Sequence, residues 1–88
     1  MTTVVQTKLF CKGIKRMSKR PYKLDKLDQV LDKLKKGVQL PRSNCNHPLL
    51  GYKNLFDVHI YGDWILLYQK ELGVLRLVAT GTHADIFG

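Results

Sequence analysis

Two segments in the first half of the chain carry apolar residues at the spacing of an α-helix. The first stripe is Leu9, Phe10, Ile14 and Met17, with basic residues at most of the positions between them. The second stripe is Leu24, Leu27, Val30, Leu31 and Leu34, followed by Lys35, Lys36 and Gly37. Basic residues and a glycine are typical of a helix C-terminus. We therefore predict a hairpin of two amphipathic helices, the first ending before Pro21 and the second at Gly37, preceded by a strand over residues 3–7.

From Leu55 onward the apolar period changes to two, which is typical of β-strands. Residues 56, 58 and 60 are apolar, whereas Asp57 and His59 occupy the other face. Residues 64–68 are apolar on both faces, as expected of a central strand, and residues 74–80 form a third run. This pattern predicts an antiparallel meander. The stretch before it, residues 37–54, is predicted to be a long loop, and loops of such length are often functional.

Together these elements predict an α+β fold in which an N-terminal strand and a helix hairpin pack on an antiparallel β-sheet. The 88 residues suffice for one domain, residues 1–88, with one modest core. Hydrophobic residues make up 44% of the chain and charged residues 25%. This composition is that of a globular protein and argues against disorder or a fibrous repeat.

The chain is strongly basic, because 15 Lys and Arg against 7 Asp and Glu give a formal net charge of +8. Eleven of the 15 basic residues lie within residues 1–36. Such a surface favours a polyanionic partner, nucleic acid or an acidic protein, although a solvated face that serves only solubility gives the same pattern. We expect a cytoplasmic protein with no membrane partner, since no apolar stretch could span a bilayer and no signal peptide is evident. Cys11 and Cys45 lack a CxxC spacing and are expected to be reduced thiols.

All three histidines fall in the second half of the chain, namely His47 in the long loop, His59 in the first strand of the meander and His83 in the C-terminal turn. Histidine gives or accepts a proton near neutral pH. Three of them in a basic domain indicate acid-base chemistry, although unrelated surface or core histidines would have the same spacing. A zinc site that also uses Cys45 is the competing interpretation, but its ligand spacing is not a usual one for zinc.

Four blocks of the second half resemble one protein family. They are residues 47–51 (HPLLG), 57–60 (DVHI), 63–68 (DWILLY) and 80–87 (TGTHADIF). In order and spacing they are similar to the YafQ branch of the RelE-type bacterial toxins, within the RelE/ParE superfamily. The match covers residues 40–88, and the first 36 residues agree only in pattern, as a strand and helix hairpin of the expected length.

The resemblance implies an endoribonuclease of a type II toxin-antitoxin pair, an mRNA interferase that cleaves messenger RNA on the translating ribosome. It implies a cognate antitoxin as partner, and neither a metal nor another cofactor. We expect the chain to be a monomer alone and to enter a larger complex with its antitoxin. The motif positions imply a catalytic set made of His47, His59, Asp63 and His83. They also imply two RNA-binding residues, Trp64 and Phe87. Core packing is the alternative for both Trp64 and Phe87.

RNA cleavage without a metal needs few protein groups. The 2′-OH attacks the adjacent phosphorus, so the protein must accept that proton, protonate the departing 5′-oxygen and stabilise the added negative charge. We assign His83 as the general acid and His59, helped by Asp63, as the general base. Lys53 is a candidate for phosphate contact.

Two positions depart from the family pattern, because relatives commonly carry arginine where this chain has Ala79 and Phe56. Loss of such a stabilising cation can cost about 10² to 10³ in rate. Strand parity places Ala79 on the face of Leu75 and Leu77, and Arg76 on the opposite face, so Arg76 is not expected to replace the missing cation. The alternative function is therefore a weak or inactive toxin-fold protein that binds an antitoxin or RNA.

Overall fold

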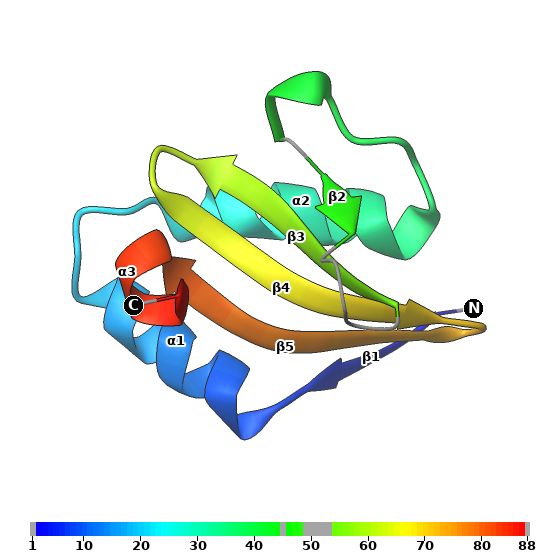
Figure 1. Cartoon of the computed structure of the whole chain (residues 1–88), viewed down its shortest axis with the longest axis horizontal. Coiled ribbons are helices and arrows are strands. Elements are labelled where there is room, and N and C mark those ends of the chain that lie inside the picture. Colours follow the sequence, from blue (N-terminus) through cyan, green and yellow to red (C-terminus); the bar gives the residue numbers. More distant parts are fainter. Residues whose placement is uncertain (1, 45, 49–53, 88) are drawn as a thin grey trace.

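A computed structural model describes residues 2–44, 46–48 and 54–87. Its elements, in chain order, are β1 (Thr3–Gln6), α1 (Lys8–Ser18), α2 (Leu24–Lys36), a 3₁₀ turn η1 (Arg42–Asn44), β2 (His47–Pro48), β3 (Leu55–Tyr61), β4 (Trp64–Glu71), β5 (Val74–Thr82) and α3 (His83–Phe87). The predicted α+β fold is confirmed. A helix hairpin packs on a sheet whose three long strands form an antiparallel meander (Figure 1).

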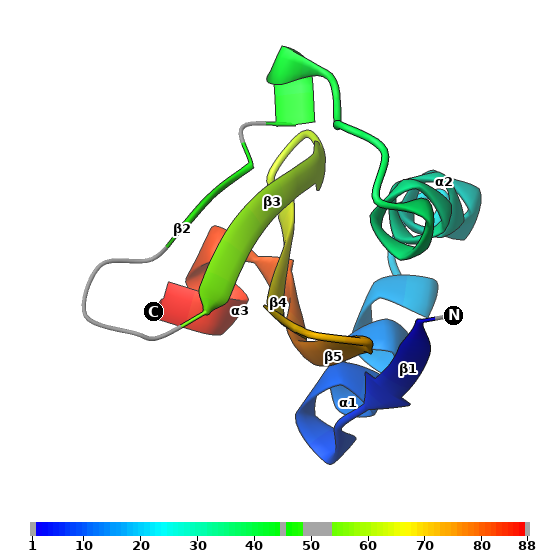
Figure 2. The ribbon, with the colours of Figure 1, turned by 90° about the vertical axis from the view of Figure 1, so that its right-hand side faces the viewer.

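The sheet has the strand order β1-β5-β4-β3-β2, which puts β4 at its centre as predicted. β1 lies parallel to β5, whereas the other pairs are antiparallel. Figure 2 shows α1 and α2 on one side of β3 and β4, and β2 and α3 on the other. Two short elements, β2 inside the predicted loop and α3 in the C-terminal turn, were not expected from the sequence.

Both helices begin and end where their sequences indicate. The Thr7 side chain caps α1 by accepting a hydrogen bond from the backbone N–H of Phe10, 3.2 Å away. Gly37 ends α2 in a left-handed conformation with φ of 71°. No helix within the described ranges is long and apolar enough to cross a membrane.

The main core lies between the helix hairpin and the sheet. Its largest side chains with almost no exposed surface are Trp64, Met17, Leu66, Leu75, Leu77 and Val58. These come from α1, β3, β4 and β5, and α2 adds its predicted stripe through Leu27, Val30 and Leu34. The helical and strand periodicities therefore describe the same buried interface from its two sides.

A β-bulge interrupts the pairing of β4 with β5. Leu67 pairs with Ala79, but the next residue of β4, Tyr68, pairs with Leu77, so Val78 is an extra residue on β5. An extra residue shifts the alternation of side chains along its strand. The parity argument is therefore wrong for Ala79, which does not share the face of Leu77.

The bulge moves Ala79 into a second apolar cluster on the other face of the sheet. This cluster contains Leu55 and Leu67, and Ile86 of α3 packs against it. Because Arg76 pairs with Gln69, two residues from Leu67 on β4, Arg76 shares the face of Ala79. The expectation that these two residues lie on opposite faces is also wrong.

Gly13 of α1 lies against the backbone of β5. A Cβ atom at this position would overlap the carbonyl oxygen of Thr80. Alanine normally stabilises a helix relative to glycine by about 1 kcal/mol. Here the opposite sign follows, because backbone atoms cannot move aside without separating α1 from the sheet.

We predict that Gly13→Ala lowers the free energy of unfolding by about 1 to 3 kcal/mol, the cost of overpacking a close contact. The measurement is a thermal or denaturant melt of both proteins. Lys12→Ala, at the exposed neighbouring position of the same helix, is the matched control and should be near neutral. A Gly13→Ala protein as stable as the original would show that α1 is not held this close to β5.

Candidate functional site

The candidate site lies at the end of the sheet where β5 continues into α3. In the β4–β5 pair, Trp64 is opposite Thr82. The residues just beyond this pair, Asp63 and His83, are therefore neighbours, although they are far apart in sequence. His83 Nδ1 lies 2.7 Å from Asp63 Oδ1, a hydrogen bond between partly exposed side chains.

Two further rings adjoin His83. The His59 ring, from β3, has its centroid 5.2 Å from that of His83 and meets it edge-on. The Phe87 ring, at the end of α3, is 6.1 Å away and 54% exposed. The structure thus brings together four predicted site residues. Phe87 does not close the core, because its ring is exposed at the surface.

The Asp63–His83 bond fixes how the His83 ring can act. An ionised carboxylate only accepts hydrogen bonds, so in this pair Nδ1 carries a proton and donates a hydrogen bond to Asp63. Nε2 is then the ring nitrogen left for a substrate, and Asp63 holds the orientation of the ring as the aspartate of a catalytic triad does. The expected pairing of Asp63 with His59 is corrected, because Asp63 bonds to His83.

Trp64, the residue after Asp63, lies in the main core with 0% of its surface exposed. Its Nε1 donates to Thr80 Oγ1 at 2.8 Å, and Thr80 Oγ1 donates in turn to the carbonyl of Ile65 at 2.8 Å. A ring with no exposed surface cannot stack on a base. The prediction of RNA contact by Trp64 is therefore corrected to the packing alternative.

The structure describes the other candidate residues to different extents. The backbone of His47 pairs with Asp57 in the β2–β3 ladder, and the catalytic role of His47 stays a prediction. Lys53 and Cys45 lie outside the described residues. Cys11 is a free, exposed thiol. Among the side chains that the structure describes, no group of three His, Cys, Asp or Glu residues could hold a metal ion.

Asp57 is a polar residue of this region to which the sequence analysis gave no role. It is only 5% exposed, and its Oδ1 has no hydrogen-bond partner among the described residues. Asp57 shares a strand face with His59, two residues away on β3. A buried carboxylate is costly without a donor, so burial distinguishes Asp57 from an ordinary strand aspartate. The alternating pattern alone could not show this burial.

A cavity of about 220 Å³ lies beside Ala79, between α1 and α3. Lys12 and Arg16 of α1 line one part of it, and Ile86 of α3 lines another. Two cations therefore border the position at which family relatives commonly have arginine. Phe56, the other departure, stacks on Tyr68 on the helix side of the sheet, with centroids 5.4 Å apart.

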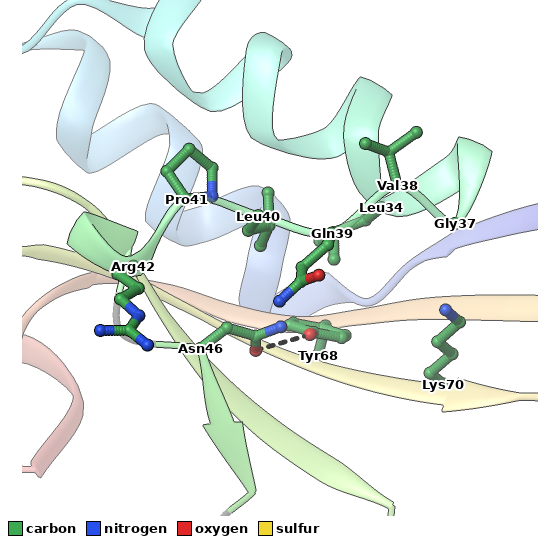
Figure 3. A pocket seen from close by; sticks show the side chains of 10 residues that line it. All are labelled: Leu34, Gly37, Val38, Gln39, Leu40, Pro41, Arg42, Asn46, Tyr68 and Lys70. Carbon is green, nitrogen blue, oxygen red and sulfur yellow. Dashed lines mark hydrogen bonds between the residues drawn. The ribbon is translucent and has the colours of Figure 1, made fainter.

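A hollow of about 420 Å³ lies between the end of α2 and β4 (Figure 3). Arg42 and Lys70 line it together with Tyr68, whose hydroxyl donates to Asn46 Oδ1 at 2.8 Å. Burial raises the pKa of the Tyr68 phenol. The residues described as lining this hollow include no histidine or aspartate, so the cluster of His59, Asp63 and His83 stays the candidate site for acid-base chemistry.

Comparisons with known proteins bear on the family and the fold of the chain. A family model described as "Bacterial toxin of type II toxin-antitoxin system, YafQ" matches residues 2–88. The mRNA interferase toxin YafQ of Escherichia coli K12 is 37% identical over 81 residues, which cover 90% of this chain and 88% of that protein.

Solved structures of YafQ have a fold similar to that of this chain. The fold is similar to YafQ in the E. coli DinJ-YafQ complex, with a TM-score of 0.93 at 33% identity and full coverage of both chains. It is also similar to YafQ from E. coli BL21(DE3), with a TM-score of 0.92 at 32% identity and full coverage.

We predict that Asp63→Asn lowers the rate of RNA cleavage, by up to the roughly 10² to 10⁴ that a positioned acid or base contributes. The reason is that an amide can donate as well as accept, so it no longer fixes which nitrogen of His83 carries the proton. The thermal midpoint should change little, because Asp63 is exposed. Cleavage of one RNA and a melting curve are measured for the original chain, Asp63→Asn and the exposed control Asp28→Asn. Equal cleavage by all three would remove Asp63 from the site.

Proposed function

The chain belongs to the YafQ family of bacterial type II toxins, and we propose that it is an mRNA interferase that cleaves RNA by metal-independent acid-base catalysis. The observation that carries this proposal is the cluster of His59, Asp63 and His83 at one exposed end of the sheet. Two imidazoles beside one another supply both an acceptor and a donor of protons near neutral pH.

In this mechanism His59 accepts the proton of the 2′-OH as that oxygen attacks the adjacent phosphorus. The bond from phosphorus to the 5′-oxygen breaks, and His83, which must enter this step as an imidazolium with protons on both ring nitrogens, donates the Nε2 proton to the departing oxygen and keeps the Nδ1 proton. The products are a 2′,3′-cyclic phosphate and a free 5′-OH. Asp63 keeps Nδ1 of His83 occupied throughout, which leaves Nε2 as the nitrogen that exchanges a proton with the RNA.

The cationic helix α1 supports the proposal that the target is RNA on the translating ribosome. The exposed basic residues of α1 and of the turn after it are Lys8, Lys12, Lys15, Arg16 and Lys19. Exposed cations attract the phosphates of messenger and ribosomal RNA without reading their sequence. The cytoplasm is the compartment that holds this substrate, and we place the protein there.

A cognate antitoxin is the proposed protein partner. The support is the similarity of the whole chain to YafQ in the E. coli DinJ-YafQ complex. A basic toxin surface also suits a partner that carries acidic residues. We propose that the chain is a monomer when free of its antitoxin and part of a larger assembly when bound.

The alternative function, a toxin-fold protein that binds its partners but cleaves weakly, is favoured by Ala79. Without arginine there, β5 offers no cation at this position to stabilise the phosphate. Lys12 and Arg16 border the cavity beside Ala79, and their charges favour the active form. The two functions differ in one measurable quantity, the rate of RNA cleavage.

The decisive experiment incubates the purified chain with a translated mRNA, with and without ribosomes. We predict cleavage in the presence of ribosomes and a loss of about 10² to 10⁴ in rate for His83→Ala. His59→Ala should lose a similar factor. Both variants should keep the thermal midpoint, since neither residue lies in the buried core. A folded His83→Ala protein that cleaves normally would contradict the assignment of the acid, and a parent chain that never cleaves would favour the alternative function.

We predict that Ala79→Arg raises the cleavage rate, by up to the roughly 10² to 10³ attributed to one stabilising donor. The adjoining cavity offers room for the longer side chain, and a planar guanidinium matches two phosphate oxygens. Ala79→Met is the matched control, because it fills the same space without a charge. Equal rates for the arginine and methionine variants would show that a cation at this position does not limit cleavage.

A further inference from the structure

Helix α3 is tied to the chain segment between α1 and α2 by a two-pronged ion pair. Arg20 Nη1 lies 2.7 Å from Asp85 Oδ2, and Arg20 Nη2 lies 3.3 Å from Asp85 Oδ1. A guanidinium that meets a carboxylate in this way fixes direction as well as distance. Asp85 is the one acidic residue of the TGTHADIF block, and it has no role in the proposed mechanism.

The same carboxylate organises the start of α3. Asp85 Oδ2 accepts hydrogen bonds from the backbone N–H and from the hydroxyl of Thr82, both at 3.0 Å. The Thr82 hydroxyl oxygen in turn accepts from the backbone N–H of Asp85 at 3.3 Å. This reciprocal arrangement is a capping box. It sets the turn from which His83, the next residue after Thr82, projects.

The ion pair is present throughout the pH range in which histidine titrates. The hydrogen bonds from Arg20 and Thr82 hold the pKa of the Asp85 carboxyl well below its usual range. Asp85 raises the pKa of the Arg20 guanidinium above its ordinary value. Because the carboxyl pKa is lowered, acid would release Asp85 only far below neutral pH. The pair is thus a constant tie, not a pH switch.

Gly81, near the end of β5, leaves room for the Asp85 carboxylate. A Cβ atom on Gly81 would lie 2.9 Å from Asp85 Cβ and 3.1 Å from its Oδ2. Both distances are too short for an unstrained contact. Absence of a side chain at position 81 therefore allows α3 to fold back until Asp85 reaches Arg20.

Helix α3 needs such anchors, because its five residues (His83–Phe87) are too few to form a stable helix alone. On its apolar side Ile86 packs against the cluster of Leu55, Leu67 and Ala79. On its polar side the anchor is Asp85. Both rings that α3 contributes to the site, those of His83 and Phe87, depend on how the helix is docked.

The geometry points to Arg20 and Asp85 as positioning residues for RNA cleavage, which hold α3 so that His83 meets Asp63. This inference rests on the proposed function. In it, neither Arg20 nor Asp85 touches the substrate. The cations proposed to hold RNA, which do not include Arg20, lie outside α3, whereas Phe87 lies on it. Loosening α3 should therefore lower kcat by a larger factor than it raises KM. A displacement of about 1 Å in a catalytic group can cost about 10²-fold.

The test uses the full chain and three substitutions. Asp85→Asn keeps the shape and removes the charge, Arg20→Gln removes the other charge, and the third protein carries both changes. The matched control is Asp32→Asn, which breaks the exposed Asp32–Lys36 ion pair of α2, 3.0 Å long, far from α3 in sequence. The measurements are kcat and KM for mRNA cleavage and the thermal midpoint of unfolding.

We expect each single variant to lose about tenfold to a hundredfold in kcat, with a smaller change in KM and a nearly unchanged thermal midpoint. The double variant should be no worse than the poorer single variant, because both changes break the same contact. Asp32→Asn should cleave like the parent chain. Direct RNA contact by Arg20 would give another result, since Asp85→Asn would then free Arg20 and lower KM while Arg20→Gln raised it. Opposite effects of this kind, or an unchanged kcat in both single variants, would overturn the inference.

Amide hydrogen exchange of residues 83–87 provides a readout that does not depend on activity. We expect faster exchange in Asp85→Asn and Arg20→Gln than in the parent chain, and no change in Asp32→Asn. If the parent chain does not cleave RNA, the proposed function fails while the exchange data still decide whether this ion pair holds α3. Unaltered exchange in both variants would refute the positioning role even in an active enzyme.

Discussion

The buried hydrogen bonds of Trp64 and Thr80 are the constraint on which the site depends. The indole N–H of Trp64 bonds to the Thr80 hydroxyl, which itself bonds to a β4 carbonyl. A slip of one residue between β4 and β5 would turn Thr80 to the other face and leave the indole unpaired in the core. The buried pair thus selects the register that sets Trp64 opposite Thr82. Asp63 and His83 meet because of that register.

The parts of the fold that follow from burial could be predicted from the sequence. The stripe from Leu24 to Leu34 and the unbroken apolar run at residues 64–68 each face one core, so their periods identify a helix and a central strand. Gly37 also follows from the sequence, because a left-handed residue ends α2. At the site, the motif blocks predicted that His59, Asp63 and His83 belong together, and the three side chains do lie side by side, while their catalytic roles stay predictions.

The errors arose where a local feature carries no periodic signal. A single extra residue at Val78 reversed the face of Ala79, and no pattern in β5 reveals it. The burial of Trp64 and Asp57 depends on neighbours from other strands, which one strand's sequence cannot show. Helix α3 is too short for a period, but the Thr82-to-Asp85 spacing is that of a capping box and could have indicated where it begins.

The parallel pairing of β1 with β5 has a consequence for how the protein comes into being on a ribosome. Thr3 of β1 pairs with Val74 of β5, so β1 cannot form its strand pairing until β5 has been synthesised. Until β5 emerges, α1 lacks the surface on which Gly13 rests, and the nascent chain can build neither the long-range sheet nor its core. His83 follows β5 directly. A translation product that ends before β5 is complete therefore lacks both the β1–β5 pairing and His83, the proposed acid, and we expect it not to cleave RNA.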